Sequence, residues 1–473
     1  MNKKMFSLTI KQDTRTEKYV VDEQTNLMDV LIEKRFFLVG ACGRRGICRT
    51  CLVEVDGKWL KACQTKLNKD TFVVVPAVGI KNTANSVHLN QSHQYHLVLD
   101  IGTTTLILYI VDQTMQEVVH EEYIMNPQQS FGADVISRIA ASKTNLFTMQ
   151  KMITDAINQI IEKFEMGMAR QLFVVGNTTM LHLFLGVDPV SIGEAPYQPV
   201  FLEEKKVKGS DLGIDIEEII ILPGKSAFIG ADVISGVYLV KSRLEKKTSI
   251  YIDLGTNGEI VLHHQGRWYA ASSAAGPAFE GACISCGTGG IAGAIDHIKD
   301  SNNWEYSTIA NKEPIGICGS GLIDCIALLR EKELIDQYGM FKNLQKDFLL
   351  TDTIRITQED VHQVQYAKSA VYSALLVLLD QANLDKNQVE EVLVAGGLGA
   401  YIQFDHAIRI GLFPEEWKNK IYPIGNASGY GAVWYSLQQK KDVLKQLIKQ
   451  IKVIDLAGNT LFGQLFLEEL IIR

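Results

Sequence analysis

The chain has 473 residues, of which 47% are hydrophobic and 21% charged, and its formal net charge is −7. This length predicts several globular domains, and the acidic balance without a long basic run excludes an extended nucleic-acid surface. The apolar runs are too short to cross a bilayer and no signal-peptide core follows the first Met, so a cytoplasmic protein is expected, with cysteines reduced or metal-bound.

Residues 6–75 read as short strands around one helix. Apolar alternation predicts strands over 6–11, 18–22, 51–55, 58–63 and 72–75. Helical spacing of Leu and Val predicts a helix over 26–35 with Thr25 or Asn26 as its N-cap, and Asp56-Gly57 predicts a tight turn. Strand, strand, helix, loop and hairpin is the order of a β-grasp ferredoxin.

Four of the eight cysteines lie in the loop after this helix and in the hairpin that follows, with the spacing C-x5-C-x2-C-x11-C. Glycines between them allow the loop to curl so that backbone N–H groups point at the sulfurs. Four converging thiolates suit a [2Fe–2S] cluster. A structural zinc site is the alternative, but zinc ribbons usually present two C-x2-C pairs and this loop has one. We therefore predict that a [2Fe–2S] cluster is held by Cys42, Cys48, Cys51 and Cys63.

A polar stretch separates this region from the rest of the chain. Residues 76–95 lose apolar periodicity and are rich in Asn, Gln, Ser, Thr and His, which is typical of a linker. We predict a ferredoxin-like domain over 1–76, a flexible linker over 77–95, a first subdomain over 96–247, and a second subdomain with a C-terminal extension over 248–473.

Two stretches after the linker share one pattern, a strand, a turn of small residues and a second strand, at 96–111 and 249–262. Asp100 and Asp253 stand near the ends of the first strands, and Gly-Thr follows two residues later in both, at a constant offset of 153. One such turn suits any hairpin, but two at a fixed offset indicate a duplicated domain. The glycines allow N–H groups to surround phosphate oxygens, and a carboxylate at the strand end can hold Mg²⁺ through water.

Other motifs follow the same theme. A buried strand at 391–395 ends in two glycines, which would let a nucleoside lie against the backbone, and the small residues at 425–434 predict a close helix crossing. The sequence GADVIS occurs at 132–137 and 230–235, and both copies predict helix starts. Asp232 in the second copy favours the helix dipole or, alternatively, holds Mg²⁺ or orients water. Asn177 either reaches a nucleotide or caps a helix.

As a set, these motifs resemble the ASKHA superfamily of acetate and sugar kinases, heat-shock chaperones and actin, over residues 96–435. The implied fold class is a multidomain α/β protein: a β-grasp [2Fe–2S] ferredoxin domain followed by a duplicated actin-like, ribonuclease H-like ATPase domain. The resemblance implies that ATP and Mg²⁺ lie between the two hairpins, with Asp100, Asp253 and Asp232 as catalytic carboxylates. The nucleotide-binding residues that it implies are Gly102, Thr103, Thr104, Thr105, Asn177, Gly255, Thr256, Asn257, Gly396 and Gly397.

A [2Fe–2S] ferredoxin domain fused to an ASKHA domain resembles the ATP-dependent reductive activators of corrinoid proteins. The stretches 174–189, 274–285, 317–324 and 395–414 look similar to that family. The resemblance implies a repair reaction, in which one electron passes from the cluster to an inactive Co(II) corrinoid and regenerates Co(I) in an ATP-dependent manner. It implies as partners a corrinoid protein of a methyltransferase system and an electron donor such as a ferredoxin or a reductase, and a homodimer is a further expectation.

Two other functions stay open. A small-molecule kinase with the ferredoxin domain as a redox sensor would need a carboxylate directed at a substrate hydroxyl, which Asp232 offers. A scaffold or chaperone-like ATPase would use the cluster structurally. Glu280 and Ser285 are candidates for contact with a corrinoid partner. A buried apolar role is favoured over a second metal site for Cys283, Cys286, Cys318 and Cys325.

Overall fold

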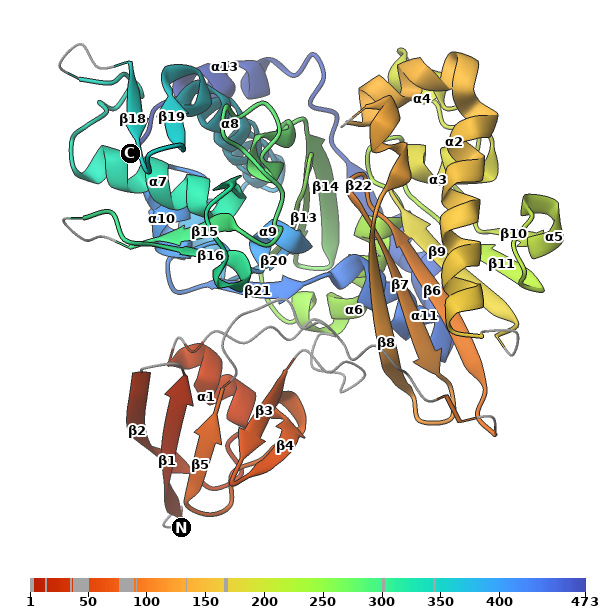
Figure 1. Ribbon diagram of the computed structural model, residues 1–473, viewed down its shortest axis with the longest axis horizontal. Coiled ribbons are helices and arrows are strands. Elements are labelled where there is room, and N and C mark those ends of the chain that lie inside the picture. Colours follow the sequence, from red (N-terminus) through yellow and green to blue (C-terminus); the bar gives the residue numbers. More distant parts are fainter. Residues whose placement is uncertain are drawn as a thin grey trace.

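The computed structural model describes residues 4–12, 15–34, 36, 51–75, 89–90, 92–132, 134–165, 169–299, 303–342 and 346–473. They form a five-stranded sheet and two six-stranded sheets in chain order, with smaller sheets of three and two strands (Figure 1). Within these ranges, no helix has the length and apolar character needed to span a membrane.

The first body is the five-stranded sheet, whose order β2-β1-β5-β3-β4 matches the predicted β-grasp arrangement. β1 pairs parallel with β5 and antiparallel with β2, and β3 pairs antiparallel with β4 and β5. Apolar side chains including Leu8, Leu31 and Val73 form its core. Its elements are β1 Met5–Gln12, β2 Arg15–Asp22, α1 Leu27–Glu33, β3 Leu52–Val55, β4 Lys58–Lys61 and β5 Thr71–Val74.

The strand predicted over 58–63 ends earlier, at Lys61, and Ala62–Gln64 forms a 3₁₀ turn. The first N–H of this turn donates to the carbonyl of Cys51 at 2.9 Å, which draws the chain back towards the start of β3. Asn26 accepts from an N–H in the first turn of α1 at 3.0 Å and donates to the carbonyl of Cys63 at 3.0 Å. The start of α1 is therefore tied to the segment that contains Cys63.

The second body is a six-stranded sheet of order β10-β11-β9-β6-β7-β8, packed by helices. Both GADVIS copies begin helices as predicted: the side chain of Asp134 accepts from Ser137 N at the start of α2, and Gly230 is the N-cap of α6. The elements are β6 Tyr95–Ile101, β7 Thr105–Asp112, β8 Glu117–Met125, α2 Val135–Lys163, β9 Gln171–Gly176, α3 Thr178–Leu185, α4 Val190–Gly193, β10 Lys205–Lys208, α5 Gly209–Leu212, β11 Glu218–Ile221 and α6 Ala231–Leu244.

The third body is a six-stranded sheet of order β21-β20-β12-β13-β14-β22. Helix α7 is almost fully buried and most of α8 is buried, and together they supply much of its core. The main elements are β12 Ser249–Leu254, β13 Gly258–His264, β14 Arg267–Ser273, α7 Gly319–Glu331, α8 Gln358–Gln381, β20 Glu391–Ala395, α9 Gly396–Gly399, α10 Phe404–Arg409, β21 Ile421–Gly425, α11 Ala427–Gln438, α12 Lys441–Gln450, β22 Ile451–Val453 and α13 Thr460–Glu468. The smaller strands are β15 Ala294–Ile298, β16 Tyr306–Thr308, β17 Gly316–Ile317, β18 Asp347–Leu349 and β19 Arg355–Thr357.

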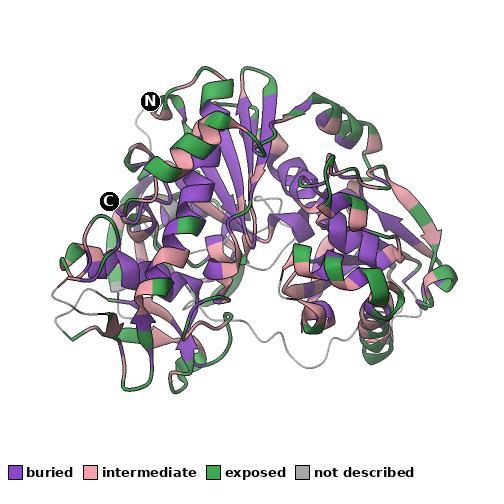
Figure 2. Cartoon of the chain, turned by 90° about the horizontal axis from the view of Figure 1, so that it is seen from above, coloured by how far each residue is buried: buried purple, intermediate pink, exposed green. Residues whose placement is uncertain are grey.

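The duplication inferred from the sequence is visible in strand pairing. β6 pairs antiparallel with β7 and parallel with β9, and β12 pairs antiparallel with β13 and parallel with β20. β6 and β20 are buried along their whole length, as are the centres of both sheets in Figure 2. Buried parallel strands of this kind require helices on their faces, which fits the α/β class.

The predicted close helix crossing lies between α6 and α11. A Cβ atom placed on Gly431 would stand 2.0 Å from the backbone oxygen of Ser235, so only a glycine allows this approach. Although α11 follows the third sheet in sequence, its apolar side chains, such as Tyr430 and Val433, join the core of the second body. The crossing helices therefore connect the two duplicated halves.

A buried carboxylate fastens part of the third body. Asp324 of α7 is fully buried, and its oxygens lie 2.6 Å from His406 Nδ1, 2.8 Å from Gln403 Nε2 and 3.0 Å from His297 Nδ1. These partners come from α10, the residue before it, and β15. Three side-chain partners around one buried carboxylate hold α7, α10 and β15 in one arrangement.

Candidate functional site

The two cluster cysteines that the structure describes lie close together. Cys51 and Cys63 are both buried in the first body, and their Sγ atoms are 3.4 Å apart. This separation is too long for a disulfide, whose sulfurs lie about 2.05 Å apart. It is close to the roughly 3.8 Å between two thiolates on one tetrahedral metal with bonds of about 2.3 Å. The pair therefore fits a metal–sulfur centre, and the predicted ligands Cys42 and Cys48 lie outside the described residues.

The first Asp-x-Gly-Thr hairpin is closed by backbone bonding. Gly102 N donates to Thr105 O at 3.0 Å, and a Cβ on Gly102 would meet that oxygen at 2.7 Å. Asn126 holds the same turn, because its Nδ2 donates to Gly102 O at 2.8 Å and its N–H donates to Thr104 O at 2.9 Å. The turn is thus fixed from both sides before any ligand is considered.

Arg138 of α2 supports this hairpin from below and was not anticipated from the sequence. Its side chain is fully buried, and it donates to Thr103 O at 2.6 Å and to Gly132 O at 2.9 Å. Burial lowers the pKa of Arg138 to about 10, with the nearby charges of Asp134 and Glu280 acting in the opposite direction. The guanidinium remains charged at neutral pH and is directed at the backbone of the phosphate-type turn.

The second hairpin repeats the turn with less support. Gly255 N donates to Asn257 O at 3.0 Å, and Thr256 is buried. Gly396, at φ 87°, packs directly against the end of β12, since a Cβ on it would stand 2.4 Å from Leu254 O and 2.8 Å from Asp253 Oδ1. Gly397 is exposed, with open space where a Cβ would point. The two glycines therefore differ: one permits the backbone to approach the second hairpin, and the other leaves a free surface beside it.

Three predicted carboxylates gather between the hairpins and influence one another. Burial, together with the charges of Asp253 and Asp100, raises the pKa of Asp232 to about 7. Burial likewise raises the pKa of Asp100 and of Asp253 to about 6. Glu259 of β13, which sequence reasoning missed, belongs to the same group, because burial and then the charges of Asp232 and Asp253 raise its pKa. Carboxylates whose pKa values are raised mainly by burial, and in part by each other's charge, are candidates for a functional site.

Two of the carboxylates are oriented by neighbouring side chains. Asp100 accepts hydrogen bonds from Asn426 Nδ2 at 2.8 Å and Ser428 Oγ at 3.2 Å, both at the start of α11. Asp253 accepts from Tyr251 at 3.1 Å. The first strand of one half is in this way bonded directly to the crossing helix of the other half.

Asn177 caps a helix, which is one of the two roles that the sequence left open, and it also contacts the first hairpin. Its Oδ1 accepts from Met180 N at 2.9 Å and caps α3, while its Nδ2 lies 3.3 Å from Thr103 Oγ1. A Cβ on Gly230 would meet the Asn177 Cα at 2.7 Å, which brings the start of α6 next to the same loop. The cap of α3, the start of α6 and the first hairpin therefore share one small region.

Glu280 connects the two hairpins. One carboxylate oxygen accepts from Thr104 Oγ1 at 2.9 Å and the other from Thr256 Oγ1 at 2.9 Å. The sequence suggested this residue as a partner contact, whereas the structure positions it inside the hairpin site, which comprises both hairpins, the carboxylates between them and Glu280. Nothing in its local sequence signals this role, because the two bonded threonines belong to different halves.

The other four cysteines do not converge. The predicted buried role is confirmed for Cys318 and Cys325, but it is wrong for Cys283, which is exposed in the loop after Glu280, and it holds only in part for Cys286, which is partly exposed. Burial raises the pKa of the Cys325 thiol, as expected for an inert core cysteine. In the part of the chain that the structure describes, no group of three or more His, Cys, Asp or Glu side chains has the arrangement of a metal site.

Comparison with known families accounts for nearly the whole chain. Residues 10–73 match the model of a 2Fe–2S iron-sulfur cluster binding domain, residues 95–246 match the RACo middle region, and residues 247–473 match the C-terminal ASKHA domain of RACo. The first body is therefore a [2Fe–2S]-type domain, and the predicted combination of a ferredoxin and an ASKHA domain is confirmed.

Individual relatives agree with this assignment. The corrinoid activation enzyme RamQ of Eubacterium limosum is 32% identical over 413 residues, covering 79% of this chain and 69% of the relative. A reductase of Methanosarcina barkeri, named for the Co(II) methylated amine-specific corrinoid protein, is 25% identical and covers 71% of this chain and 68% of its own. The solved structure of a reductive activator for a corrinoid, iron-sulfur protein superposes with a TM-score of 0.74 at 24% identity, covering 99% of this chain and 98% of that one. The chain belongs to the family of reductive activators of corrinoid proteins.

Proposed function

We propose that this chain is an iron–sulfur ATPase that reactivates a corrinoid protein of a methyltransferase system. One electron passes from its [2Fe–2S] cluster to a Co(II) corrinoid, giving Co(I), and the transfer depends on ATP. The observation that supports this most directly is the occurrence, in one chain, of the buried thiol pair Cys51 and Cys63 and of two phosphate-type hairpins joined through Glu280. The names of the relatives agree with it.

The chain's residues have distinct tasks in this reaction. The cluster, when bound, supplies a single electron at a potential of the order of −400 mV in plant-type ferredoxins. The apolar surroundings of Cys51 and Cys63 exclude water from the thiolates. An external donor, such as a ferredoxin or a reductase, must return one electron after each turnover for the electrons to balance.

The hairpin site would bind Mg-ATP. The N–H groups of the two turns and the hydroxyls of Thr103, Thr104 and Thr256 are suitable donors for phosphate oxygens. Burial raises the pKa values of Asp100, Asp232 and Asp253, and a divalent cation held through water would favour the charged forms of these carboxylates. We assign the adenosine side to Gly396 and Gly397. A homodimer remains a prediction.

One observation favours the alternative, a small-molecule kinase with the ferredoxin domain as a redox sensor. Burial raises the pKa of Asp232 to about 7, which suits a general base acting on a substrate hydroxyl. The same carboxylate could instead orient the water that hydrolyses ATP, so the two functions differ in their acceptor rather than in this residue.

An anaerobic experiment separates these functions. The reduced protein is mixed with a corrinoid protein held as Co(II), and the Co(II) EPR signal is followed with and without Mg-ATP. Loss of the signal only with ATP, its persistence with Cys51→Ser, and normal loss with the exposed control Glu313→Gln would support the proposal. A signal that persists with wild-type protein while a metabolite becomes phosphorylated would replace it with the kinase function.

A further inference from the structure

The Glu280 carboxylate accepts hydrogen bonds from threonine hydroxyls that a phosphate group would also need as donors. It accepts one hydrogen bond from each half of the duplicated domain, from Thr104 and from Thr256, both at 2.9 Å. It also approaches the second turn, since a Cβ on Gly255 would stand 3.7 Å from its Oε1. A carboxylate and a phosphate oxygen compete for the same donors, and their like charges repel each other.

The segment that carries Glu280 is a short turn that packs against helices of the third body. Pro277–Glu280 forms one 3₁₀ turn, bounded by glycines at φ 76° and φ 82°. A Cβ on Gly319, at the start of α7, would lie 1.9 Å from Phe279 O and 2.9 Å from the side chain of Leu398 in α9. The turn therefore rests on α7 and beside the helix that begins with Gly396.

We propose that Glu280 distinguishes nucleoside triphosphates from diphosphates in the hairpin site. The terminal phosphate of a triphosphate takes the Thr104 and Thr256 hydroxyls and displaces the carboxylate, whereas a diphosphate leaves the bridge intact. This inference rests on the proposed nucleotide binding and adds a residue to it. The buried guanidinium of Arg138 favours a negative charge here in either state, because it donates to the carbonyl of Thr103 and its pKa is influenced by the charge of Glu280.

Displacement of Glu280 has a direct mechanical consequence. The chain continues from Glu280 into residues 281–293, a glycine-rich loop whose residues 289–292 are exposed. A Cβ on Gly281 would stand 2.3 Å from Thr288 O, so the loop folds back tightly on the turn that carries the carboxylate. A shift of that turn therefore moves the loop as well. The triphosphate then binds more tightly to the conformation with the shifted loop than to the other one, which is the difference in affinity that coupling requires.

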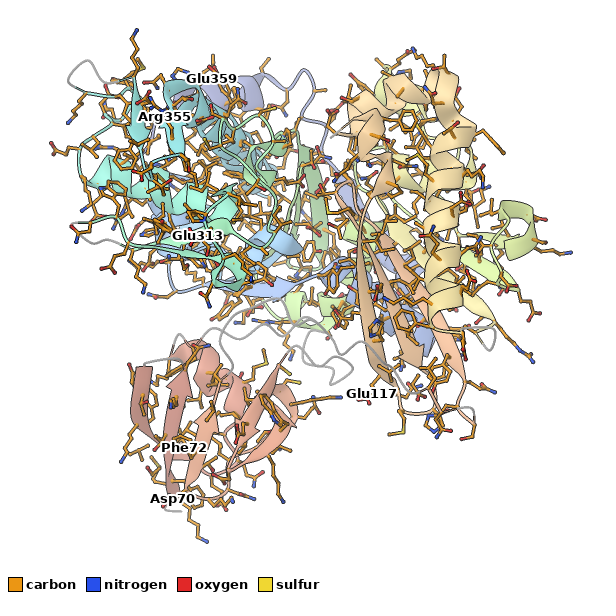
Figure 3. The ribbon with its side chains drawn as sticks, viewed as in Figure 1. Asp70, Phe72, Glu117, Glu313, Arg355 and Glu359 are labelled. Carbon is orange, nitrogen blue, oxygen red and sulfur yellow. The ribbon has the colours of Figure 1, made fainter. Side chains whose placement is uncertain are left out.

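The test compares dissociation constants of a non-hydrolysable ATP analogue and of ADP, both with Mg²⁺, by titration calorimetry. Glu280→Gln keeps the shape but removes the charge, so the analogue is expected to bind about tenfold more tightly, equivalent to about 1.4 kcal/mol, while ADP affinity changes less than twofold. Glu280→Asp, which retains the charge on a shorter side chain, should lie between wild type and Gln. The control Glu313→Gln, an exposed carboxylate labelled in Figure 3, should match wild type.

Hydrogen exchange of residues 281–293 supplies a second readout that a purely structural role would not alter. The ATP analogue, but not ADP, is expected to change exchange in wild type, and the Gln variant should lose this distinction. If the Gln variant keeps the wild-type ratio of ATP-analogue to ADP affinity, the role of Glu280 is refuted while nucleotide binding stands. If wild-type protein binds neither nucleotide, the proposed ATPase function itself is overturned.

Discussion

Replacement of Arg138 by Met tests whether the hydrogen bonds of this side chain stabilise the conformation of the first hairpin. Met fills a similar volume but donates nothing, so the carbonyls of Thr103 and Gly132 lose hydrogen bonds of 2.6 and 2.9 Å. Bonds from a charged donor contribute about 1.5–3 kcal/mol each, or roughly 3–6 kcal/mol for the two. Removing a buried charge offsets part of this loss, which leaves an expected destabilisation of about 2–4 kcal/mol.

The effect should reach the nucleotide, because the Thr103 peptide belongs to the turn that would surround phosphate. We expect amide exchange of residues 102–105 to accelerate, and Mg-ATP to bind about 10–100-fold more weakly, since about 1.4 kcal/mol corresponds to a factor of ten. Lys143→Met, on the exposed face of the same helix, is the control and should change stability by less than about 0.5 kcal/mol. Wild-type exchange and affinity in the Arg138 variant would refute the reasoning.

Asp324→Asn should cost about 3–5 kcal/mol near pH 6, because it leaves buried donors without their charged partner. Burial lowers the pKa of His297 but Asp324 raises it more, and burial raises the pKa of Asp324 but His297 and His406 lower it more. The contribution of His297 to the free energy of unfolding is present below about pH 6.5 and is lost as the pH rises through its raised pKa, whereas the contribution of Asp324 is present above about pH 3.9 and is lost at lower pH. Urea unfolding should therefore give a smaller difference in stability between wild type and variant at pH 9 than at pH 6. An equal difference at the two pH values would contradict this. Gly431→Ala should destabilise the protein by about 1–3 kcal/mol, because the added Cβ clashes with α6 at the helix crossing. The control Gly463→Ala, whose Cβ meets nothing within 4 Å, should stabilise α13 by about 0.5–1 kcal/mol. Equal effects of the two substitutions in thermal unfolding would contradict the close approach of α6 and α11.

The local pattern of the sequence was sufficient for most elements. Alternating apolar residues located β1 and β2, and the Asp-Gly pair located the turn between β3 and β4. The strand predicted over 58–63 was too long, because the contact between the turn after Lys61 and Cys51 is tertiary and no alternation marks it. Glycine spacing in 425–434 also predicted a close approach, but not the helix that Gly431 meets.

The contact between the first and second bodies is another feature that could not be predicted from the sequence. Lys61, near the cluster cysteines, forms an ion pair of 2.8 Å with Glu117 on the edge strand β8, and Figure 3 shows Glu117 on the side of that sheet nearest the first body. Neither residue stands out in the sequence. A partly exposed pair of this kind contributes at most about 1 kcal/mol, so it is compatible with separation of the two bodies.

The cysteine spacing and the two Asp-x-Gly-Thr turns could be recognised without a structure, since each is encoded within a few neighbouring residues, and comparison of the two turns gave their fixed offset. The hydrogen-bond partners of these turns became known from the folded chain, because Thr104 and Glu280 are 176 positions apart in sequence, and Asp100 and Asn426 are 326 apart. Such pairs depend on how the duplicated halves pack against each other. That packing is the sum of many buried contacts, so no short stretch of sequence records it.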